Sequence, residues 1–311
     1  MPPGEPTPET LRNPLARYLL ATRPAFLSVT FCAWMVGIGA AHCSGVAVDP
    51  ALAALTLAFA LVVHAGVNVL NDYYDARIGT DAINDERIFP FTGGSRFIQN
   101  GVLSTAQTGL FGAVLFGAVM VAGMALMKRS DAGLFWIGAA GLLVGWAYSA
   151  PPLKLNSRGL GEICVAAGFA LIVVGTDYVQ RAQLASLPWV AAVPYALLVT
   201  NLLYINQFPD READRRTGKW HLVVRLGPAR ARWGYVALCV AAYAWLAGAV
   251  AAGALPRASL AALVAALPSA LAARELWLHA MQPSQLAKGI KLTIAAALTH
   301  GLLSSAALLA G

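Results

Sequence analysis

The stretch NVLNDYYDARIGTD, residues 68–81, places amide and carboxylate side chains at the end of a long apolar segment. If the helix of that segment continues through the stretch, Asn68, Asp72 and Asp75 share one face, because residues three, four and seven positions apart lie above one another. Like charges stacked in this way destabilise a helix, and desolvation near a membrane adds to the cost. The pattern therefore indicates a bound ligand that offsets the repulsion.

A second stretch repeats the arrangement. Residues 206–219 read NQFPDREADRRTGK, so Asn206, Asp210 and Asp214 recur at every fourth position, and both stretches continue as Asp-x-x-x-Gly. Carboxylate and amide oxygens suit Mg²⁺, which fills its remaining positions with water and phosphate oxygens. Alternatively, any one of these residues is a solvated helix end or a cap. The duplication favours two facing columns that hold Mg²⁺ ions and a diphosphate. The first column is Asn68, Asp72 and Asp75, the second is Asn206, Asp210 and Asp214, and all six residues are predicted metal ligands.

The composition places these columns in a membrane protein. Hydrophobic residues make up 58% of the chain and charged residues only 12%, with a mean hydropathy of +0.63. Such a chain has too little polar surface to cover itself in water. Apolar segments of about 20 residues predict an all-α polytopic protein with nine transmembrane helices, around residues 25–42, 52–70, 108–127, 133–150, 160–178, 187–206, 233–252, 255–273 and 290–310.

The basic residues fit this topology. Numbered across nine spans, 18 of the 22 Lys and Arg residues lie on one side, and the other side has only Lys128, Arg129, Arg181 and Arg257. Positively charged loops favour the cytoplasm, so the split predicts a cytoplasmic N-terminus and an external C-terminus. It also assigns the net charge of +7 to topology, and no nucleic-acid partner is expected. Residues 1–16 are polar and proline-rich and predict a flexible tail, followed by a single membrane domain over residues 17–311.

Basic side chains near the columns are candidates for holding the diphosphate. In WAYSAPPLKLNSRGLGE, the Pro151–Pro152 pair stops a helix and places Lys154 and Arg158 on the same side as the columns. Arg77 follows the first column, and Arg96 follows two glycines in FTGGSRF. Ammonium and guanidinium groups suit phosphate oxygens. The alternative is that these cations only anchor the topology.

Together, NDYYDARIGTD, GGSRFIQNGVLS, YSAPPLKLNSRGLGE, GTDYVQ and DREADRRTGKWHLVVRLG resemble the UbiA superfamily of membrane prenyltransferases, and most closely its 1,4-dihydroxy-2-naphthoate polyprenyltransferase branch. The resemblance runs from Arg23 into the last apolar segment. It implies a helical bundle around a central cavity open to the cytoplasm, two Mg²⁺ ions, a polyprenyl diphosphate donor and an aromatic acceptor. The catalytic residues it implies are Asp72, Asp75, Asp210, Asp214 and Lys154. Asp81 lies six residues after Asp75, so metal binding and loop capping both stay open for it.

The implied reaction is an aromatic alkylation in menaquinone synthesis in a bacterial cell membrane, with no protein partner expected. Asn71, His64, Tyr148 and Tyr204 are weaker candidates for contacting the acceptor or stabilising a carbocation, and interior packing is the alternative for each. Other acceptors, such as 4-hydroxybenzoate or homogentisate, and a terpene cyclase remain alternatives. A transporter is the alternative of another class. It is disfavoured because twelve of the fifteen acidic residues fall on one side of the predicted bundle.

Overall fold

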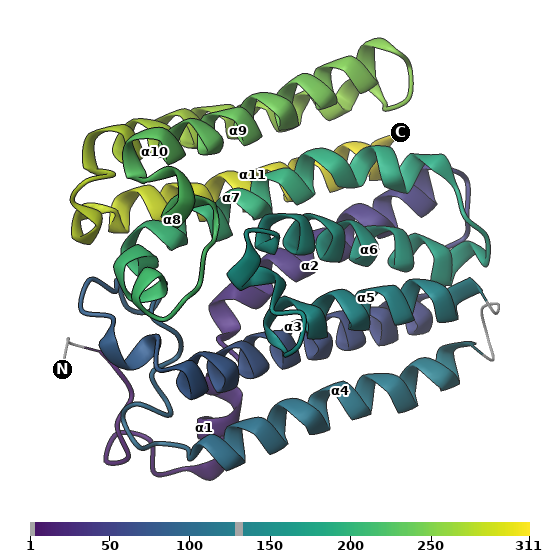
Figure 1. Ribbon diagram of the computed structural model, residues 1–311. Helices are drawn as coiled ribbons and strands as arrows, with labels where there is room; N and C mark the ends of the chain where they lie inside the picture. The colour runs from purple at the N-terminus through teal and green to yellow at the C-terminus, as the bar shows by residue number, and fades with distance from the viewer. Residues whose placement is uncertain (1–3, 128–132) are drawn as a thin grey trace.

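Helices and the loops that join them build the described chain, which in this computed structural model covers residues 4–127 and 133–311 (Figure 1). Lys128 and Arg129, two of the predicted external cations, lie outside the described residues. No β-strand occurs in the described ranges, which confirms the all-α prediction. The helices are α1 (Pro14–Ala21), α2 (Pro24–Cys43), α3 (Pro50–Ile78), α4 (Thr105–Met127), α5 (Gly133–Ser149), α6 (Gly161–Arg181), α7 (Ser186–Arg216), α8 (Leu222–Leu226), α9 (Pro228–Ala251), α10 (Ala266–His279) and α11 (Ala287–Ala310), with 3₁₀ turns η1 (Asp81–Ile83), η2 (Leu155–Arg158), η3 (Arg257–Ala265) and η4 (Pro283–Gln285).

Eight helical segments of the described chain are long and apolar enough to cross a bilayer, with η3 and α10 counted as one. Each coincides with a predicted apolar segment. The remaining predicted segment is α5, an apolar helix of 17 residues, which is short for a span. The protein is therefore a polytopic membrane protein, and the number nine stays a prediction.

Helix α3 shows why the first column is helical. Asp49 caps its start by accepting hydrogen bonds from the backbone N–H groups of Ala51 and Leu52, and Pro50 occupies the first turn, where no amide partner is needed. The helix ends at Gly79, whose φ of 82° is in the left-handed region that glycine adopts without strain. Between these ends α3 continues without a break, so the first column lies on one helix face, as predicted.

Helix α7 extends the second column in the same way. It runs for 31 residues and remains helical across Pro209, which lies between two of the column residues. Proline removes one backbone donor, but the helix continues to Arg216 and keeps Asn206, Asp210 and Asp214 at four-residue spacing. The sequence prediction required each helix to continue through its polar stretch, and both α3 and α7 do so.

Small residues allow the central helices to approach closely. A Cβ added at Gly37 of α2 would lie 2.5 Å from the carbonyl oxygen of Val173 in α6, and one at Gly301 of α11 would lie 2.7 Å from Cys32 in α2. Close backbone contact through glycine is typical of membrane helices, because lipid tails leave packing as the main force between them. These contacts fix α2 between α6 and α11.

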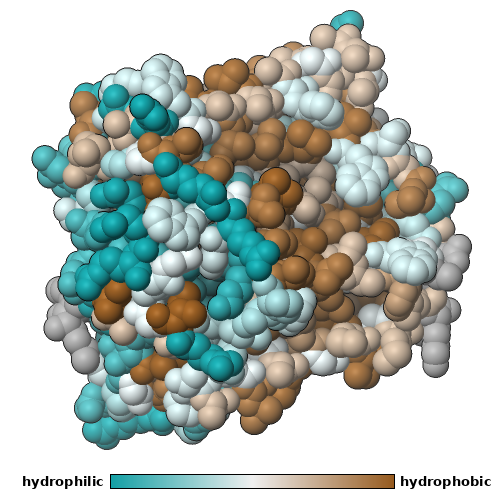
Figure 2. Space-filling view, in the orientation of Figure 1, coloured by the Kyte–Doolittle hydropathy of each residue, from teal (hydrophilic) through white to brown (hydrophobic). Residues whose placement is uncertain are grey.

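Polar residues gather at one end of the bundle. Figure 2 shows hydrophilic residues on the left of the view, over α8 and the loop that joins α3 to α4, and a hydrophobic band to their right. The described N-terminal segment, from Gly4 onward, lies at this polar end and the C-terminus at the opposite end (Figure 1). Within the predicted tail, Glu5 is buried and pairs with Arg87 of the loop between α3 and α4, with 2.8 Å between Oε1 and Nε.

Candidate active site

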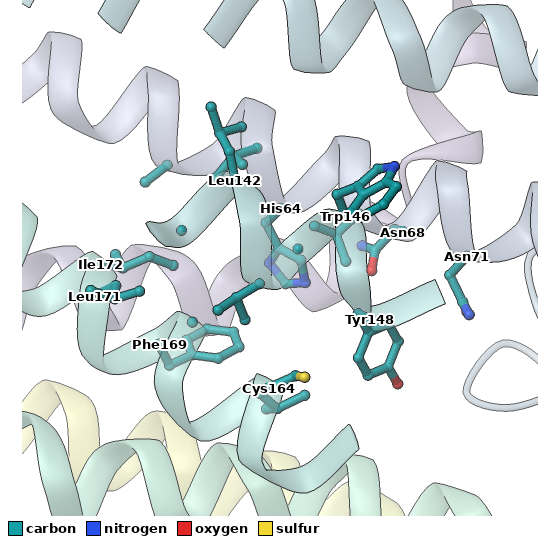
Figure 3. A pocket seen from close by; sticks show the side chains of 18 of the residues that line it. His64, Asn68, Asn71, Leu142, Trp146, Tyr148, Cys164, Phe169, Leu171 and Ile172 are labelled. Carbon is teal, nitrogen blue, oxygen red and sulfur yellow. The ribbon is translucent and has the colours of Figure 1, made fainter. Parts of the chain in front are cut away.

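A cavity of about 980 Å³ runs through the bundle, lined mainly by α3, α4, α5, α6 and α7. Its wall is mostly apolar, and its polar residues are concentrated at the end where the two columns lie. In Figure 3, Asn68, Asn71 and the hydroxyl of Tyr148 lie to one side of the view, and Leu171 and Ile172 to the other. The cavity therefore has a polar head and an apolar body.

The two columns meet at the polar head through Lys219. Its Nζ lies 3.1 Å from Oδ2 of Asp75 in α3 and 3.1 Å from Oδ1 of Asp214 in α7. His221 places Nε2 at 3.2 Å from the other carboxylate oxygen of Asp214. Residues more than 130 positions apart in the chain thus share one cation, so the structure brings the predicted columns together.

The loop between α3 and α4 covers this head and contacts both columns. Asn84 donates to Oδ1 of Asp210 at 2.6 Å, and the backbone N–H of Ser95 donates to both carboxylate oxygens of Asp72 at 3.2 and 3.3 Å. Gly94, with φ of 72°, leads the loop past Asp72 and Asp81 so closely that a Cβ there would collide with the Asp81 carboxylate. Glycine is required at this position.

The oxygen donors fit a hard cation. Oxygen-bearing residues of the columns and their neighbours line the cavity, whereas Asp72 is not among the lining residues; those that line it are Asn68, Asn71, Asp75, Asp81, Asn206, Asp210 and Asp214. Oδ2 of Asp81 and Oδ1 of Asn206 are buried and have no hydrogen-bond partner, and the same holds for Oε1 of the lining residue Gln207. Such atoms are costly to bury unless a ligand satisfies them.

Within the described ranges, no three His, Cys, Asp or Glu side chains are close enough to hold a metal ion by themselves. Lys219, Asn84 and the Ser95 amide contact the carboxylates of the columns instead. The predicted metal ligands therefore stay a prediction, supported by the donor types and the unpartnered oxygens.

Two buried ionisable groups of the polar head, Asp81 and Lys219, lie just beyond the membrane-spanning helices and have shifted pKa values. Burial raises the pKa of Asp81 well above its usual range, and the neighbouring Asp75 and Asp72 carboxylates add to the increase. Burial acts to lower the pKa of Lys219, but Asp214 and Asp75 outweigh it and raise that pKa well above its usual value. Lys219 is thus a permanent cation at neutral pH.

The four cations predicted to bind the diphosphate lie away from the large cavity; they are Arg77, Arg96, Lys154 and Arg158. Lys154 lines a separate pocket of about 240 Å³ on the other side of Asp75, together with Arg77. Arg158 donates to the carbonyl of Pro152 at 2.8 Å. Arg96 donates to the carbonyl of Asp81. In the described structure none of these four side chains lines the large cavity.

Three of the four weaker candidates for contacting the acceptor or a carbocation line the cavity, and Tyr204 does not. His64 lines the cavity, and its Nδ1 lies 2.6 Å from Oγ1 of Thr30, so it is both a lining residue and a hydrogen-bonded interior histidine. Asn71 donates to Asp75 at 3.1 Å, and Tyr148 lines the cavity. Tyr204 points elsewhere: its hydroxyl donates to the carbonyl of Ala231 in α9 at 2.9 Å. Tyr204 is not among the lining residues, so the structure favours interior packing for it, and its contact with an acceptor stays a prediction.

Sequence reasoning missed Lys219, Arg23, Asn84 and His221, all of which lie at the polar head. Lys219 is the last residue of the second quoted stretch, five positions after Asp214, so its proximity to that carboxylate was available as a signal. Arg23 lines the cavity, and its Nη2 donates at 2.9 Å to the carbonyl of Phe91 in the covering loop. No local pattern marks Arg23 or Asn84.

Comparison with known proteins agrees with this architecture. Residues 30–297 match the model of the UbiA prenyltransferase family. The chain is 34% identical over 230 residues to the 1,4-dihydroxy-2-naphthoate octaprenyltransferase of Mycobacterium leprae, covering 73% of this chain and 74% of that protein. It is 31% identical over 222 residues to the enzyme of the same name from Escherichia coli, covering 69% and 70%.

Solved structures share the fold. A UbiA homologue from Aeropyrum pernix K1 superposes with a TM-score of 0.70 at 19% identity, covering 88% of this chain and 96% of that one. A UbiA homologue from Archaeoglobus fulgidus, bound to DMAPP and Mg²⁺, gives 0.62 at 17% identity, covering 93% and 99%. The family match, the identity to curated relatives and the helical bundle agree, and the chain is an integral-membrane prenyltransferase of the UbiA family.

Proposed function

We propose that this protein transfers a polyprenyl group from its diphosphate to 1,4-dihydroxy-2-naphthoate, a step of menaquinone biosynthesis. The observation that carries the proposal is the junction of the two columns at the polar head of a long apolar cavity. A polyprenyl diphosphate has the same division, with a charged head and an apolar tail. The names of the relatives from Mycobacterium leprae and Escherichia coli support the choice of acceptor.

The columns are proposed to hold two Mg²⁺ ions. The Mg²⁺ bound with DMAPP in the Archaeoglobus fulgidus homologue supports metal dependence, and the unpartnered oxygens of Asp81 and Asn206 support it in this chain. Bound Mg²⁺ would neutralise the charge that develops on the leaving diphosphate. Lys219 and Arg23 supply fixed positive charge at the same end of the cavity.

In the proposed reaction the allylic C–O bond breaks, and its electron pair leaves with the diphosphate. The resulting allylic cation is attacked by a ring carbon of the acceptor, which forms the new C–C bond. The apolar cavity wall excludes water, which would otherwise capture the cation. Tyr148 lies at the polar head, where its ring can stabilise the cation through its π face.

A naphthoate acceptor removes the need for a strong base. If the ring carbon that bears the carboxylate is attacked, CO₂ leaves and its bonding electrons restore the aromatic ring. Acceptors alkylated at a C–H position must instead lose a proton to a base. His64 is the lining histidine nearest the first column, and its Nδ1 is already engaged by Thr30.

The polar head is proposed to face the cytoplasm of a bacterial cell. Most Lys and Arg residues fall on the loops at that end, as the positive-inside rule requires for a cytoplasmic face. The N-terminus would then be cytoplasmic and the C-terminus external. A diphosphate and an anionic acceptor are both expected to approach from this side.

Membranes that contain the protein should transfer a labelled polyprenyl group to dihydroxynaphthoate in the presence of Mg²⁺. We expect Asp72→Ala and Asp210→Ala each to lower the rate at least about 100-fold, because a carboxylate that stabilises the departing charge contributes several kcal/mol. EDTA should abolish transfer, and added Mg²⁺ should restore it. The matched control is Asp85→Ala, since Asp85 is an exposed carboxylate in the loop between α3 and α4.

Full activity in EDTA or in either column variant would overturn the metal assignment. A panel of acceptors tests the substrate. Faster transfer to 4-hydroxybenzoate or homogentisate than to dihydroxynaphthoate would overturn the naphthoate assignment, and a cyclised product formed without acceptor would indicate a terpene cyclase.

A further inference from the structure

Four glycines leave the body of the cavity unusually open. Gly123 of α4, Gly138 and Gly141 of α5, and Gly168 of α6 all line the cavity, and a Cβ added at any of them would meet nothing within 4 Å. Glycine inside a helix is less favourable than other ordinary residues. Its presence here is not explained by close helix packing, because no neighbour approaches these positions.

The cavity is long enough for several isoprenyl units. Its lining on α3 runs from Asp75 to Thr56, which is about 28 Å at about 1.5 Å per residue. An isoprenyl unit has one more chain bond than an amino-acid residue, which spans at most about 3.6 Å, so each unit extends by about 5 Å. The cavity therefore takes about five or six units.

The glycines lie at different depths. Gly168 is adjacent to Phe169, whose ring lies 5.6 Å from that of His64, and His64 is about 16 Å along α3 from Asp75. Gly138 is deeper. A Cβ on Gly175 would lie 3.2 Å from Ile137 of α5, and Gly175 is about 10 Å farther along α6 than Gly168. The two positions correspond to about three and about five isoprenyl units.

The cavity wall is also open to the membrane beside these glycines. Met120 of α4 and Phe135 and Leu143 of α5 line the cavity, yet they are 60%, 49% and 58% exposed. A side chain can contact both the cavity and the exterior only where the wall is one residue thick or interrupted. A chain longer than the cavity can continue between α4 and α5 into the surrounding lipid.

We infer that these glycines determine which chain lengths the enzyme accepts, by keeping the path of the prenyl tail clear between the polar head and the opening at α4 and α5. The inference rests on the proposed function and extends it to the length of the donor. A side chain at Gly168 would obstruct the tail after about three units, and one at Gly138 after about five.

The test compares Gly168→Leu and Gly138→Leu with the unaltered enzyme, using donors of two, four and eight isoprenyl units. We expect kcat/KM for the two-unit donor to stay within twofold in both variants. For the four-unit donor it should fall at least tenfold in Gly168→Leu alone, and for the eight-unit donor it should fall at least tenfold in both. Leucine favours a helix more than glycine does, and the space at each Cβ is open, so folding should be retained.

Gly117→Leu is the matched control. Gly117 also lies in α4 with open space around its Cβ, but it does not line the cavity. This variant should keep the length profile of the unaltered enzyme. Should a leucine variant fail to insert, the valine variant at the same position is measured in its place.

The inference is overturned if both variants retain transfer from the two-unit donor and keep the original ratio between long and short donors. It is also overturned if Gly117→Leu changes that ratio as much as they do. Failure of the proposed function gives a different result: the unaltered enzyme then transfers no donor of any length to the naphthoate.

Discussion

Lys219 holds together two carboxylates from helices that are distant in the sequence. Its ammonium is 3.1 Å from both Asp75 and Asp214, and the residue is buried. A buried charge needs partners, because desolvation of an isolated one is very costly. In the absence of a divalent ion, Lys219 is the group that balances the columns.

We expect Lys219→Met to destabilise the metal-free protein by about 3–5 kcal/mol, the usual cost of leaving a buried ion pair without one partner. Thermal unfolding of the detergent-solubilised protein in EDTA measures this change. Mg²⁺ should narrow the difference in stability between Lys219→Met and the unaltered protein, because a divalent ion would balance the same carboxylates.

Lys288→Met is the matched control for Lys219. Lys288 also pairs with a carboxylate, Glu275, at 2.7 Å, but its side chain is 70% exposed. An exposed pair contributes about 0–1 kcal/mol. Equal unfolding temperatures for Lys219→Met and the unaltered protein in EDTA would show that the columns do not depend on Lys219.

At the scale of elements, the loop between α3 and α4 is held by the N-terminal segment. The Glu5 carboxylate accepts hydrogen bonds from Nε of Arg87 at 2.8 Å and from Nδ2 of Asn100 at 3.2 Å. Arg96, which also faces Glu5, donates to the carbonyl of Asp81. The family match begins at residue 30, so Glu5 lies outside the matched region and its partners in the loop lie within it.

We expect Glu5→Gln to loosen the loop. A hydrogen bond to a charged group contributes about 1.5–3 kcal/mol, so amide hydrogen exchange between residues 84 and 100 should accelerate by about tenfold or more. Tryptic cleavage after Arg87 and Arg96 should accelerate with it. Glu9→Gln is the control, because Glu9 lies in the same segment and is exposed.

Acid should act in the same direction as Glu5→Gln. Burial acts to raise the pKa of Glu5, but the hydrogen bonds from Arg87 and Asn100 outweigh it and hold that pKa below its ordinary value of 4.5. A lowered pKa in the folded protein means that the contact is fully present above pH 4.5 and is lost as the pH falls through the folded value. Unchanged exchange in Glu5→Gln would show that the contact does not hold the loop.

At the scale of the whole molecule, the polar head and the C-terminus lie at opposite ends of the bundle (Figure 1). The predicted orientation therefore places the C-terminus outside the cell. Between α10 and α11 the chain returns to the polar end, at the loop that contains Gln282.

Reporter fusions test this orientation. We expect alkaline phosphatase to be active when fused after Gly311 and inactive when fused after Gln282, with green fluorescent protein giving the reverse pattern. The pair of fusions differs by one helix, α11, so each is the control for the other. The same reporter response at both positions would contradict the predicted topology.

Much of the fold could be predicted from local sequence. Apolar segments of the right length fix where helices lie, because the bilayer gives unpaired backbone groups no alternative partner. Only the segment with Pro256 and Pro268 became irregular, as η3 followed by α10. Proline lacks the backbone donor that residues in an α-helix interior normally use, and α10 begins so that Pro268 lies in its first turn.

The membrane class, the helical segments and the two columns could be read from the sequence, because each depends on residues that lie close together in the chain. The contact of Lys219 with both columns, the direction of Tyr204 toward α9 and the open cavity beside four glycines became visible only in the folded protein. These features depend on how each helix is rotated against partners from distant parts of the chain. That rotation is set by packing among many side chains, which no local pattern encodes.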